Sequence, residues 1–419
     1  MKIIFAINAG SSSLKISVYL AEDRNATPRQ IANAQISGLT SQSTKLTYIR
    51  GNESIYKNHQ VRAGSQDDAF DIILNSLVGD ENLDEIGSKS DIAITCHRIV
   101  HGGKYESAQI ITKDTYYHIQ TLSDLAPLHN GAALGIVETC IRKLPDTTNI
   151  ACFDTQFHMS LPPHVYTYPI NQERAQKNGL RKYGFHGLSY SFITRSVAKF
   201  LQKDVSKLNI IALHLGSGAS ACAIKGGKSW DTSMGLTPLS GLPGATRSGS
   251  VDPSLVFHYA SDVGKLSPTS TAKLHISKAE EILNKESGLS ALAGTTDFAV
   301  IAGADRAEHP QSALAFDLFV DRVSAFIGSY YVSLEGRVDA LVFAGGIGEK
   351  SSRFRSAVVS STACLGFGIS DSANDSISTE GSVVQDISSE DTRSKVLVCQ
   401  TDEQIEMACM CASKNELWD

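Results

Sequence analysis

Two turns rich in small residues have the composition of a phosphate-binding site. Residues 8–13 read N-A-G-S-S-S, and residues 214–220 read H-L-G-S-G-A-S. Turns of this kind present backbone N–H groups and hydroxyls to an anion, and Lys15 adds a cation just after the first turn. The first turn alone is equally compatible with an ordinary serine-rich hairpin tip, and the Walker A motif G-x-x-x-x-G-K-[ST] is absent from the sequence. The second turn favours phosphate binding. Two such turns facing one cleft would hold a polyphosphate.

Arginine, aspartate and histidine side chains recur beside glycine and other small residues. The segments read C-H-R-I-V-H-G-G (96–103), A-P-L-H-N (126–130), F-D-T-Q-F-H (153–158), Y-G-F-H-G (183–187) and G-A-T-R-S-G (244–249). An arginine fork binds planar carboxylate and phosphoryl groups through two parallel hydrogen bonds, which lysine cannot do. Arg98 and Arg247 are therefore candidate anion ligands. A single histidine in such a turn is more often structural, and the strand pattern before His97 and His101 opposes a shared metal site on one helix face.

Three apolar runs that end in glycine-rich turns must position these side chains. They cover residues 3–7, 210–213 and 340–343, and short runs bounded by glycine indicate buried strands. The first two runs continue through their turns into a second apolar run, so each predicts a β-hairpin with a wide polar tip. Gly10 and Gly216, at the two tips, lie about 206 residues apart, near half the chain. This spacing favours a duplicated core with one hairpin in each half.

Helical periodicity falls between the expected strands. It predicts helices over residues 130–143, 189–201 and 313–334, and Pro145 ends the first of them. Strands that alternate with helices indicate an α/β fold. Three polar stretches are expected to be exposed loops, hairpins or connectors: residues 56–65, 261–271 and 370–395.

Length and composition exclude several classes of protein. The 419 residues predict two or three domains, and 38 basic against 44 acidic residues give a net charge of −6, which argues against a general nucleic-acid binder. No apolar run approaches the ~20 residues of a membrane helix, and the N-terminal run is too short for a signal peptide. The eight cysteines lack the spacing of a zinc site, so reduced buried thiols and a cytoplasmic protein are expected.

Eight motifs, in order along nearly the whole chain, resemble those of the acetate kinase family. They are N-A-G-S-S-S-L-K (8–15), H-R-I-V-H-G-G (97–103), A-P-L-H-N (126–130), F-D-T-Q-F-H (153–158), Y-G-F-H-G (183–187), H-L-G-S-G-A-S (214–220), T-R-S-G-S-V-D-P (246–253) and G-G-I-G-E (345–349). The family belongs to the superfamily of sugar kinases, the heat-shock ATPase and actin. The resemblance therefore implies duplicated actin-like, ribonuclease H-like α/β domains that flank a nucleotide cleft. It also implies a homodimer, a first domain of about residues 1–154 with 405–419, and a second of about 155–404. Closure of the domains is expected because a phosphorylated product must be kept from water.

The activity implied by the resemblance is acetate kinase. ATP and acetate would give ADP and acetyl phosphate reversibly, by direct in-line phosphoryl transfer that depends on Mg²⁺. The implied catalytic residues are Arg98, His129, Asp154, His186 and Arg247. The two arginines would hold the carboxylate and the migrating phosphoryl group, and the two histidines would lie beside that group. Asp154 would either orient an arginine or reach Mg²⁺ through water, and the sequence leaves both roles open.

The resemblance also assigns the binding residues. The implied metal ligands are Asn8 and Glu403. The implied nucleotide ligands are Ser11, Ser13, Lys15, His214, Gly216, Ser217, Gly218, Asp297, Phe298, Gly345, Gly346, Ile347 and Gly348. The pocket for the acetate methyl group would be formed by Val100, Leu128, Phe185 and Pro238, beside Arg98.

Three positions depart from the family pattern on the donor side. Ser217 stands where asparagine is common, Ala299 where arginine is usual, and Lys350 where asparagine is common. Pyrophosphate is therefore the alternative donor, although the retained glycines leave room for adenosine and favour ATP. Propionate or butyrate is the alternative acceptor, because one methylene is worth only ~1–3 kcal/mol in an apolar pocket. A nucleotide-gated binding or filament protein is the alternative from another class, but it would have no use for the acceptor-side arginines and histidines.

Overall fold

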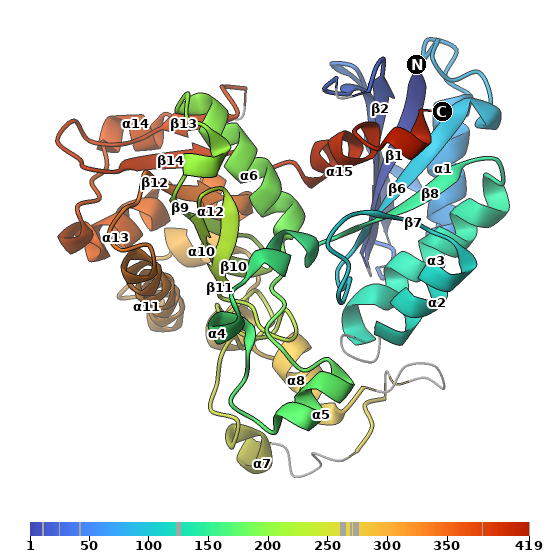
Figure 1. The fold of residues 1–419 in the computed structure, drawn as a ribbon. Coiled ribbons are helices and arrows are strands. Elements are labelled where there is room, and N and C mark those ends of the chain that lie inside the picture. The colour runs from blue at the N-terminus through green and yellow to red at the C-terminus, as the bar shows by residue number, and fades with distance from the viewer. Residues whose placement is uncertain are drawn as a thin grey trace. The chain divides into compact units, whose positions relative to one another are not determined.

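The computed structural model divides the chain into two compact units (Figure 1). Unit 1 comprises Met1–Gln156 with Asp402–Asp419, and unit 2 comprises Phe157–Thr401. The structure describes the whole chain except residues 11, 25, 42, 123–126, 260–264, 269, 271–275, 379 and 419, and except the side chains of residues 127–129, 258 and 259.

Unit 1 is built on a mixed sheet whose strands run in the order β5-β4-β3-β2-β1-β6-β8-β7. The strands are β1 (Lys2–Ala9), β2 (Ser13–Ala21), β3 (Arg29–Ser37), β4 (Thr44–Arg50), β5 (Glu53–Val61), β6 (Ile92–Ile99), β7 (Gln109–Ile110) and β8 (Thr148–Phe153). Its α-helices are α1 (Gln66–Val78), α2 (Lys113–Leu122), α3 (Pro127–Lys143) and α15 (Glu403–Ala412). Figure 1 shows α15 on one face of this sheet and α1 and α3 on the other.

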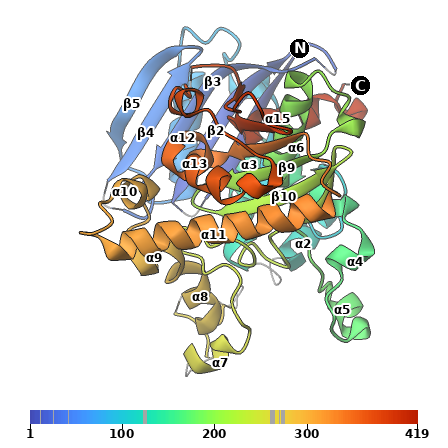
Figure 2. The ribbon, with the colours of Figure 1, turned by 90° about the vertical axis from the view of Figure 1, so that its left-hand side faces the viewer.

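Unit 2 is built on a second mixed sheet, in the order β11-β10-β9-β12-β14-β13. The strands are β9 (Ile210–Leu215), β10 (Ala219–Lys225), β11 (Lys228–Thr232), β12 (Ala340–Ala344), β13 (Val384–Asp386) and β14 (Lys395–Cys399). The helices are α4 (Pro163–Tyr166), α5 (Gln172–Asn178), α6 (Gly187–Phe200), α7 (Leu255–Tyr259), α8 (Lys278–Lys285), α9 (Gly288–Ala293), α10 (Phe298–Gly303), α11 (Pro310–Ser333), α12 (Gly345–Lys350), α13 (Ser352–Ser361) and α14 (Asp371–Asp375). Figure 2 shows the long helix α11 running below β10 in that view, and α6 packs against β9, β13 and β14.

The two sheets repeat one pattern of strand pairing. In unit 1, β3, β2 and β1 are antiparallel neighbours, and β6 and β8 extend the sheet parallel to β1. In unit 2, β11, β10 and β9 are antiparallel neighbours, and β12 and β14 extend the sheet parallel to β9. A short antiparallel strand follows at the far edge of each sheet, β7 in one and β13 in the other. The predicted α/β fold and the predicted duplication with one hairpin per half are confirmed.

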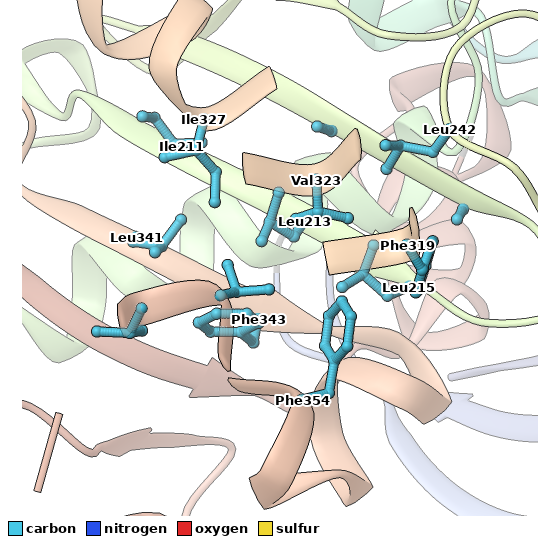
Figure 3. Close-up of a cluster of buried hydrophobic side chains, with 14 of the residues drawn as sticks. Ile211, Leu213, Leu215, Leu242, Phe319, Val323, Ile327, Leu341, Phe343 and Phe354 are labelled. Carbon is cyan, nitrogen blue, oxygen red and sulfur yellow. The ribbon is translucent and has the colours of Figure 1, made fainter. Parts of the chain in front are cut away.

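Alternation along the strands sends one set of side chains into the core and the other set to the opposite face. Leu213 and Leu215 of β9 pack with Val323 of α11 in the unit 2 core shown in Figure 3. Successive side chains of a strand point to opposite faces of the sheet. His214 therefore points to the other face, on which α6 lies, and Ser220 of β10 is its register partner. The hairpin pattern that builds the core thus also presents His214 and Ser220 to α6.

All three predicted helices are present, and each begins a few residues earlier than predicted. Helix α3 starts at Pro127 instead of residue 130, α6 at Gly187 instead of 189, and α11 at Pro310 instead of 313. Proline fits the first turn of a helix because its missing N–H would have no intrahelical partner there. The prolines before the expected starts of α3 and α11 are therefore part of the helices.

Two of the predicted loops contain regular structure. The prediction of a connector over residues 56–65 is wrong, because the chain remains in β5 up to Val61. The prediction of a loop or hairpin over residues 370–395 is wrong only for α14, because β13 forms an antiparallel hairpin with β14. β5 is also an edge strand, and most of its side chains are at least partly exposed, so it lacks the apolar alternation that reveals a half-buried strand. Most of the predicted connector 261–271 lies outside the described residues.

All eight cysteines have free thiols, and the expectation of burial holds for most of them. Six are buried with free thiols: Cys96, Cys140, Cys152, Cys222, Cys399 and Cys411. Cys364 is exposed and Cys409 is half-buried, so the expectation of burial is wrong for these two.

In the described ranges, none of the helices is both long and apolar enough to cross a membrane.

Candidate active site

One arginine and two carboxylates meet at the ends of β6, β8 and α15 in unit 1. Arg98 donates from Nη2 to Asp154 Oδ2 at 2.8 Å and from Nε to Asp154 Oδ1 at 3.2 Å. Its Nη1 lies 2.8 Å from Oε2 of Glu403, the first residue of α15. Arg98 pairs with Cys152 across β6 and β8, so Asp154, two residues further along, lies on the same face of the sheet. Strand register and the start of α15 therefore bring the three side chains together.

The charges in this cluster hold the guanidinium in one orientation. The side chain of Asp154 is 1% exposed and that of Arg98 is 18% exposed. Burial disfavours the charged guanidinium, but the attraction of Asp154 and Glu403 outweighs it, and the pKa of Arg98 lies above its usual value. Of the two roles that the sequence leaves open for Asp154, this geometry favours the orientation of an arginine.

The predicted metal ligands offer the oxygen donors that Mg²⁺ prefers. Asn8, in β1, carries an amide oxygen, and Glu403 carries a carboxylate that also forms an ion pair with Arg98. Among the described side chains, no group of three or more His, Cys, Asp or Glu residues could hold a metal ion. Mg²⁺ is commonly bound by one or two carboxylates together with substrate phosphates and water. The residues present fit a Mg²⁺ ion that arrives with a nucleotide.

The first predicted phosphate turn closes the β1–β2 hairpin of unit 1. Asn8 pairs with Lys15 in the register of β1 and β2, and Ser13 begins β2. The N–H of Gly10 donates to the carbonyl of Ser13 at 2.9 Å, which closes the tip. Ser11, which was also predicted here, lies outside the described residues.

An arginine and a histidine converge on the second hairpin tip, in unit 2. A Cβ atom at Gly218 would lie 2.1 Å from Arg247 Nη2 and 3.4 Å from His186 Nε2. A side chain at this position would therefore displace the guanidinium of Arg247, whereas the contact with His186 would be an ordinary van der Waals contact. The ring of His186 also lies 4.2 Å, centroid to centroid, from the ring of His214 on β9. The structure brings together the predicted residues His186, His214, Gly218 and Arg247.

Serine hydroxyls hold both imidazole rings. His186 Nδ1 lies 2.8 Å from Ser220 Oγ, and His214 Nδ1 lies 2.7 Å from Ser189 Oγ. His186 directly precedes α6 and has φ 59° and ψ 23°, a left-handed conformation that costs a residue with a Cβ about 1–3 kcal/mol. Its neighbours keep it in this conformation, which is frequent at functional sites.

A cavity of about 550 Å³ adjoins the same hairpin tip. Its walls come from the tip, from residues 296–303 at α10, and from α12 and the start of α13. Six residues predicted to bind the nucleotide line it: Gly216, Ser217, Asp297, Phe298, Gly346 and Ile347. The remaining two positions that depart from the family pattern, Ala299 and Lys350, line it as well. A cavity of this size is typical of sites for small molecules and cofactors.

Two further predicted glycines shape the turn into α12 and are not among the residues that line the cavity. Gly345 has φ 75°, and a Cβ atom there would lie 2.7 Å from the carbonyl oxygen of Leu215. Its N–H donates to Glu349 Oε1 at 2.9 Å, and this oxygen also accepts the N–H of Thr401 at 3.3 Å. Burial raises the pKa of the Glu349 carboxyl. Gly348 is buried against the backbone of Phe343.

The residues predicted for the acetate pocket are divided between the two units. Val100, half-buried directly after β6, belongs to unit 1, whereas Phe185 and Pro238, both buried, belong to unit 2. The side chains of Leu128 and His129 lie outside the described part of the structure, and both residues are in the first turn of α3. The pocket therefore stays a prediction.

Several residues at these sites escaped the sequence analysis. Arg353 lines the donor cavity, and its guanidinium donates to the carbonyl of Ala302. Ser189 and Ser220 form hydrogen bonds with the two histidine rings, and Tyr190 forms a hydrogen bond with Ser220. A signal for Ser220 was present in the sequence, because strand alternation after the predicted hairpin tip places it on the face of His214.

The repeated sheets, the glycine-rich tip and the adjoining cavity define a duplicated α/β protein with a cavity suited to a small molecule. A sequence profile of the acetokinase family matches residues 3–409. A probable acetate kinase of Chaetomium globosum is 57% identical over 454 aligned positions, which cover 99% of this chain and 99% of that protein.

Two solved structures are similar over their whole length. A propionate kinase from Francisella tularensis has a TM-score of 0.84 at 32% identity, covering 98% of this chain and 99% of that chain. An acetate kinase from Porphyromonas gingivalis has a TM-score of 0.82 at 30% identity, covering 99% of this chain and 100% of that chain. The chain belongs to the acetokinase family, and it is a phosphotransferase with a carboxyl group as acceptor.

Proposed function

We propose that the protein is an acetate kinase that transfers a phosphoryl group reversibly from ATP to acetate, directly and in line. The similarity to acetate kinases supports this acceptor. The observation that carries the proposal is the position of the second hairpin tip. Gly216 and Ser217 line the donor cavity, and Gly218 lies against Arg247 and His186. One three-residue tip therefore joins a site for the nucleotide to groups suited to the migrating phosphoryl group.

The chemistry of the acceptor explains why the proposed site uses arginines and a hydrogen-bond donor and no general base. Carboxyl pKa values lie near 4, so acetate is already ionised at pH 7 and needs no general base. The difficulty is the approach of one anion to another, and phosphoryl transfer is mostly positioning and charge stabilisation. Arg98 and Arg247 would hold the carboxylate and the phosphoryl oxygens, and His186 would donate a hydrogen bond to those oxygens. Asp154 would keep Arg98 in place for this task.

Mg²⁺ is proposed as the metal, with Asn8 and Glu403 as its protein ligands. When bound, it would neutralise charge on the nucleotide phosphates. Glu403 also pairs with Arg98, so this carboxylate would connect the metal ion to the arginine cluster. We also propose the predicted domain limits, a homodimer, and the predicted roles of His129, Ser11, Ser13, Lys15 and His214.

Propionate is the second candidate acceptor, because the similar structure from Francisella tularensis is a propionate kinase. Pyrophosphate is the second candidate donor because of the departures at Ser217, Ala299 and Lys350. The 550 Å³ cavity favours ATP, since pyrophosphate has no adenosine to fill it.

A survey of donors and acceptors tests the proposal. Purified protein is supplied with ATP or pyrophosphate, and with acetate, propionate or butyrate, in the presence of Mg²⁺. We expect the highest kcat/KM with ATP and acetate, and a lower value with propionate. Turnover with pyrophosphate and none with ATP would contradict the proposed donor, and a preference for propionate would contradict the proposed acceptor.

A further inference from the structure

A chain of hydroxyls runs from the core of unit 2 to the imidazole of His186. Tyr190 Oη lies 2.5 Å from Ser220 Oγ, and Ser220 Oγ lies 2.8 Å from His186 Nδ1. Tyr190 and Ser220 are both 0% exposed, so solvent cannot supply partners for these groups. The protein itself therefore fixes where each proton in the chain resides.

The buried tyrosine determines the direction of the chain. A backbone hydrogen bond from His214 lowers the pKa of Tyr190, so this bond donates to the phenol oxygen. The phenol keeps its own proton, because burial raises its pKa well above the usual value. That proton needs an acceptor, since an unsatisfied buried donor costs about 1–3 kcal/mol. Ser220 Oγ is the hydroxyl partner of Tyr190, so Tyr190 donates to Ser220.

Ser220 then has one proton to give and one imidazole nitrogen in reach. Its hydroxyl donates to Nδ1 of His186, which must be unprotonated to accept. The proton of the neutral ring is therefore on Nε2, and Nε2 is the atom that faces Gly218, beside Nη2 of Arg247. The chain of hydroxyls thus places an N–H group at the hairpin tip.

His158 in the same unit shows the contrasting case of a structural histidine. Its Nδ1 lies 2.7 Å from Ser229 Oγ, but its Nε2 lies 2.9 Å from the carbonyl oxygen of Phe185. A carbonyl only accepts, so it alone fixes the proton of His158 on Nε2. The serine is not needed there to set the tautomer, whereas Ser220 and Tyr190 set the tautomer of His186.

We propose that Ser220 and Tyr190 are positioning residues that hold His186 as the Nε2–H tautomer, ready to donate to the transferred phosphoryl group. The consequence for catalysis rests on the proposed function, but the tautomer does not. Preorganised donors accelerate transfer because they need no rearrangement as charge develops. A ring that also populated the Nδ1–H tautomer would present a lone pair to the phosphoryl oxygens part of the time, and would repel them.

Nitrogen NMR of the full-length protein with ¹⁵N-labelled histidine tests the tautomer directly. The resonances of His186 are identified by their absence from the His186→Gln variant, and the long-range coupling pattern distinguishes Nε2–H from Nδ1–H. We expect the Nε2–H tautomer in the wild type, and a mixture in Ser220→Ala and in Tyr190→Phe. The Nδ1–H tautomer in the wild type, or an unchanged Nε2–H signal in both folded variants, would overturn the proposal.

Kinetics provide the second readout. At metal sites, removing the hydrogen-bond partner that orients a ligating histidine typically costs about 10–100-fold, and we take this as the scale for His186. We expect a loss of this size in kcat for Ser220→Ala, a largely unchanged KM for ATP, and recovery in Ser220→Thr, which keeps the hydroxyl. The matched control Ser229→Ala removes the same group from His158 and should lower stability without changing the His186 signal. If the wild type transfers no phosphoryl group to any carboxylate, the proposed function fails, and the NMR result still decides the tautomer.

Discussion

At the scale of single residues, geometry separates the side chains that the sequence motifs supply. Arg98 forms ion pairs with two carboxylates in unit 1, whereas Arg247 lies beside Gly218 and His186 at the hairpin tip of unit 2. The sequence motifs predicted both arginines but could not predict this difference. It depends on Glu403, which follows Arg98 by about 300 residues and reaches it only because α15 returns to the sheet of unit 1.

Arg247→Lys tests whether a planar fork is required at the hairpin tip. Lysine keeps the charge but offers no pair of parallel N–H groups. We expect kcat to fall by about 10²–10³, as for the loss of a preorganised donor, with a much smaller change in the KM for ATP. Steady-state kinetics check this expectation, with Arg247→Ala as the reference for complete loss. Near-normal turnover in Arg247→Lys would refute a bidentate role.

Asp154→Asn tests whether Asp154 acts by holding Arg98. The amide cannot accept two charged hydrogen bonds, so Arg98 keeps only Glu403 as an anionic partner. We expect the free energy of unfolding to fall by about 1–3 kcal/mol, because charge-assisted hydrogen bonds to a buried carboxylate are lost, and kcat to fall with it. Denaturant unfolding and steady-state kinetics measure the two effects.

Asp80→Asn is the matched control for this variant. Asp80 accepts from Arg50 and Tyr48 at the sheet of the same unit, and its side chain is 9% exposed. The Asp80→Asn variant should have a lower free energy of unfolding than the wild type and an unchanged kcat. Equal losses of turnover in the two variants would show that Asp154 serves the fold alone.

At the scale of elements, two repeated hairpins position the chemistry. The apolar alternation of β1 and β9 was sufficient to predict both hairpins and their tips. It was not sufficient to predict β5, because the side chains of this edge strand are exposed or half-buried on both faces. Its sequence therefore shows no alternation of apolar and polar residues. Ser189 and Tyr190 were missed for a similar reason, since a serine or tyrosine in a helix gives no sign of the strand residue, His214 or Ser220, that it contacts on the sheet beside it.

Gly345→Ala tests the turn between β12 and α12. A methyl group there would meet the carbonyl oxygen of Leu215 at 2.7 Å, and the positive φ disfavours any side chain. We expect the unfolding free energy to fall by about 1–3 kcal/mol and the KM for ATP to rise, because Leu215 leads into the tip that lines the cavity. Gly328→Ala is the control, because Gly328 lies in α11 with open space around it and should gain up to about 1 kcal/mol. Unchanged stability in Gly345→Ala would show that the strain at this turn is absent.

At the scale of the whole molecule, stability is expected to depend on two buried histidines, one in each unit. Burial lowers the pKa of His97 and of His158 to about 4, whereas an unfolded histidine has a pKa of about 6.5. Between these values the unfolded chain binds protons that the folded chain does not. The free energy of unfolding should therefore fall as the pH drops from about 6.5 to about 4, by roughly 3 kcal/mol for each histidine.

Denaturant unfolding at a series of pH values measures this fall. The His158→Gln variant removes one of the two titrating rings and should show a shallower dependence over the same range. An unfolding free energy that stays constant between about pH 6.5 and 4.5 would contradict the pKa values that burial imposes.

The net charge of −6 gives the whole molecule no attraction for its proposed substrates, which are both anions. Positive charge must therefore be local, at Arg247 and Lys15, because the charge of Arg98 is balanced by Asp154 and Glu403. The transfer itself tests this account most directly. Purified protein is incubated with acetate, ATP, Mg²⁺ and hydroxylamine, and acetohydroxamate is measured as the trapped form of acetyl phosphate. The account predicts hydroxamate that depends on both acetate and ATP and falls by about 10²–10³ in Arg247→Lys; no hydroxamate from the wild-type protein would contradict it.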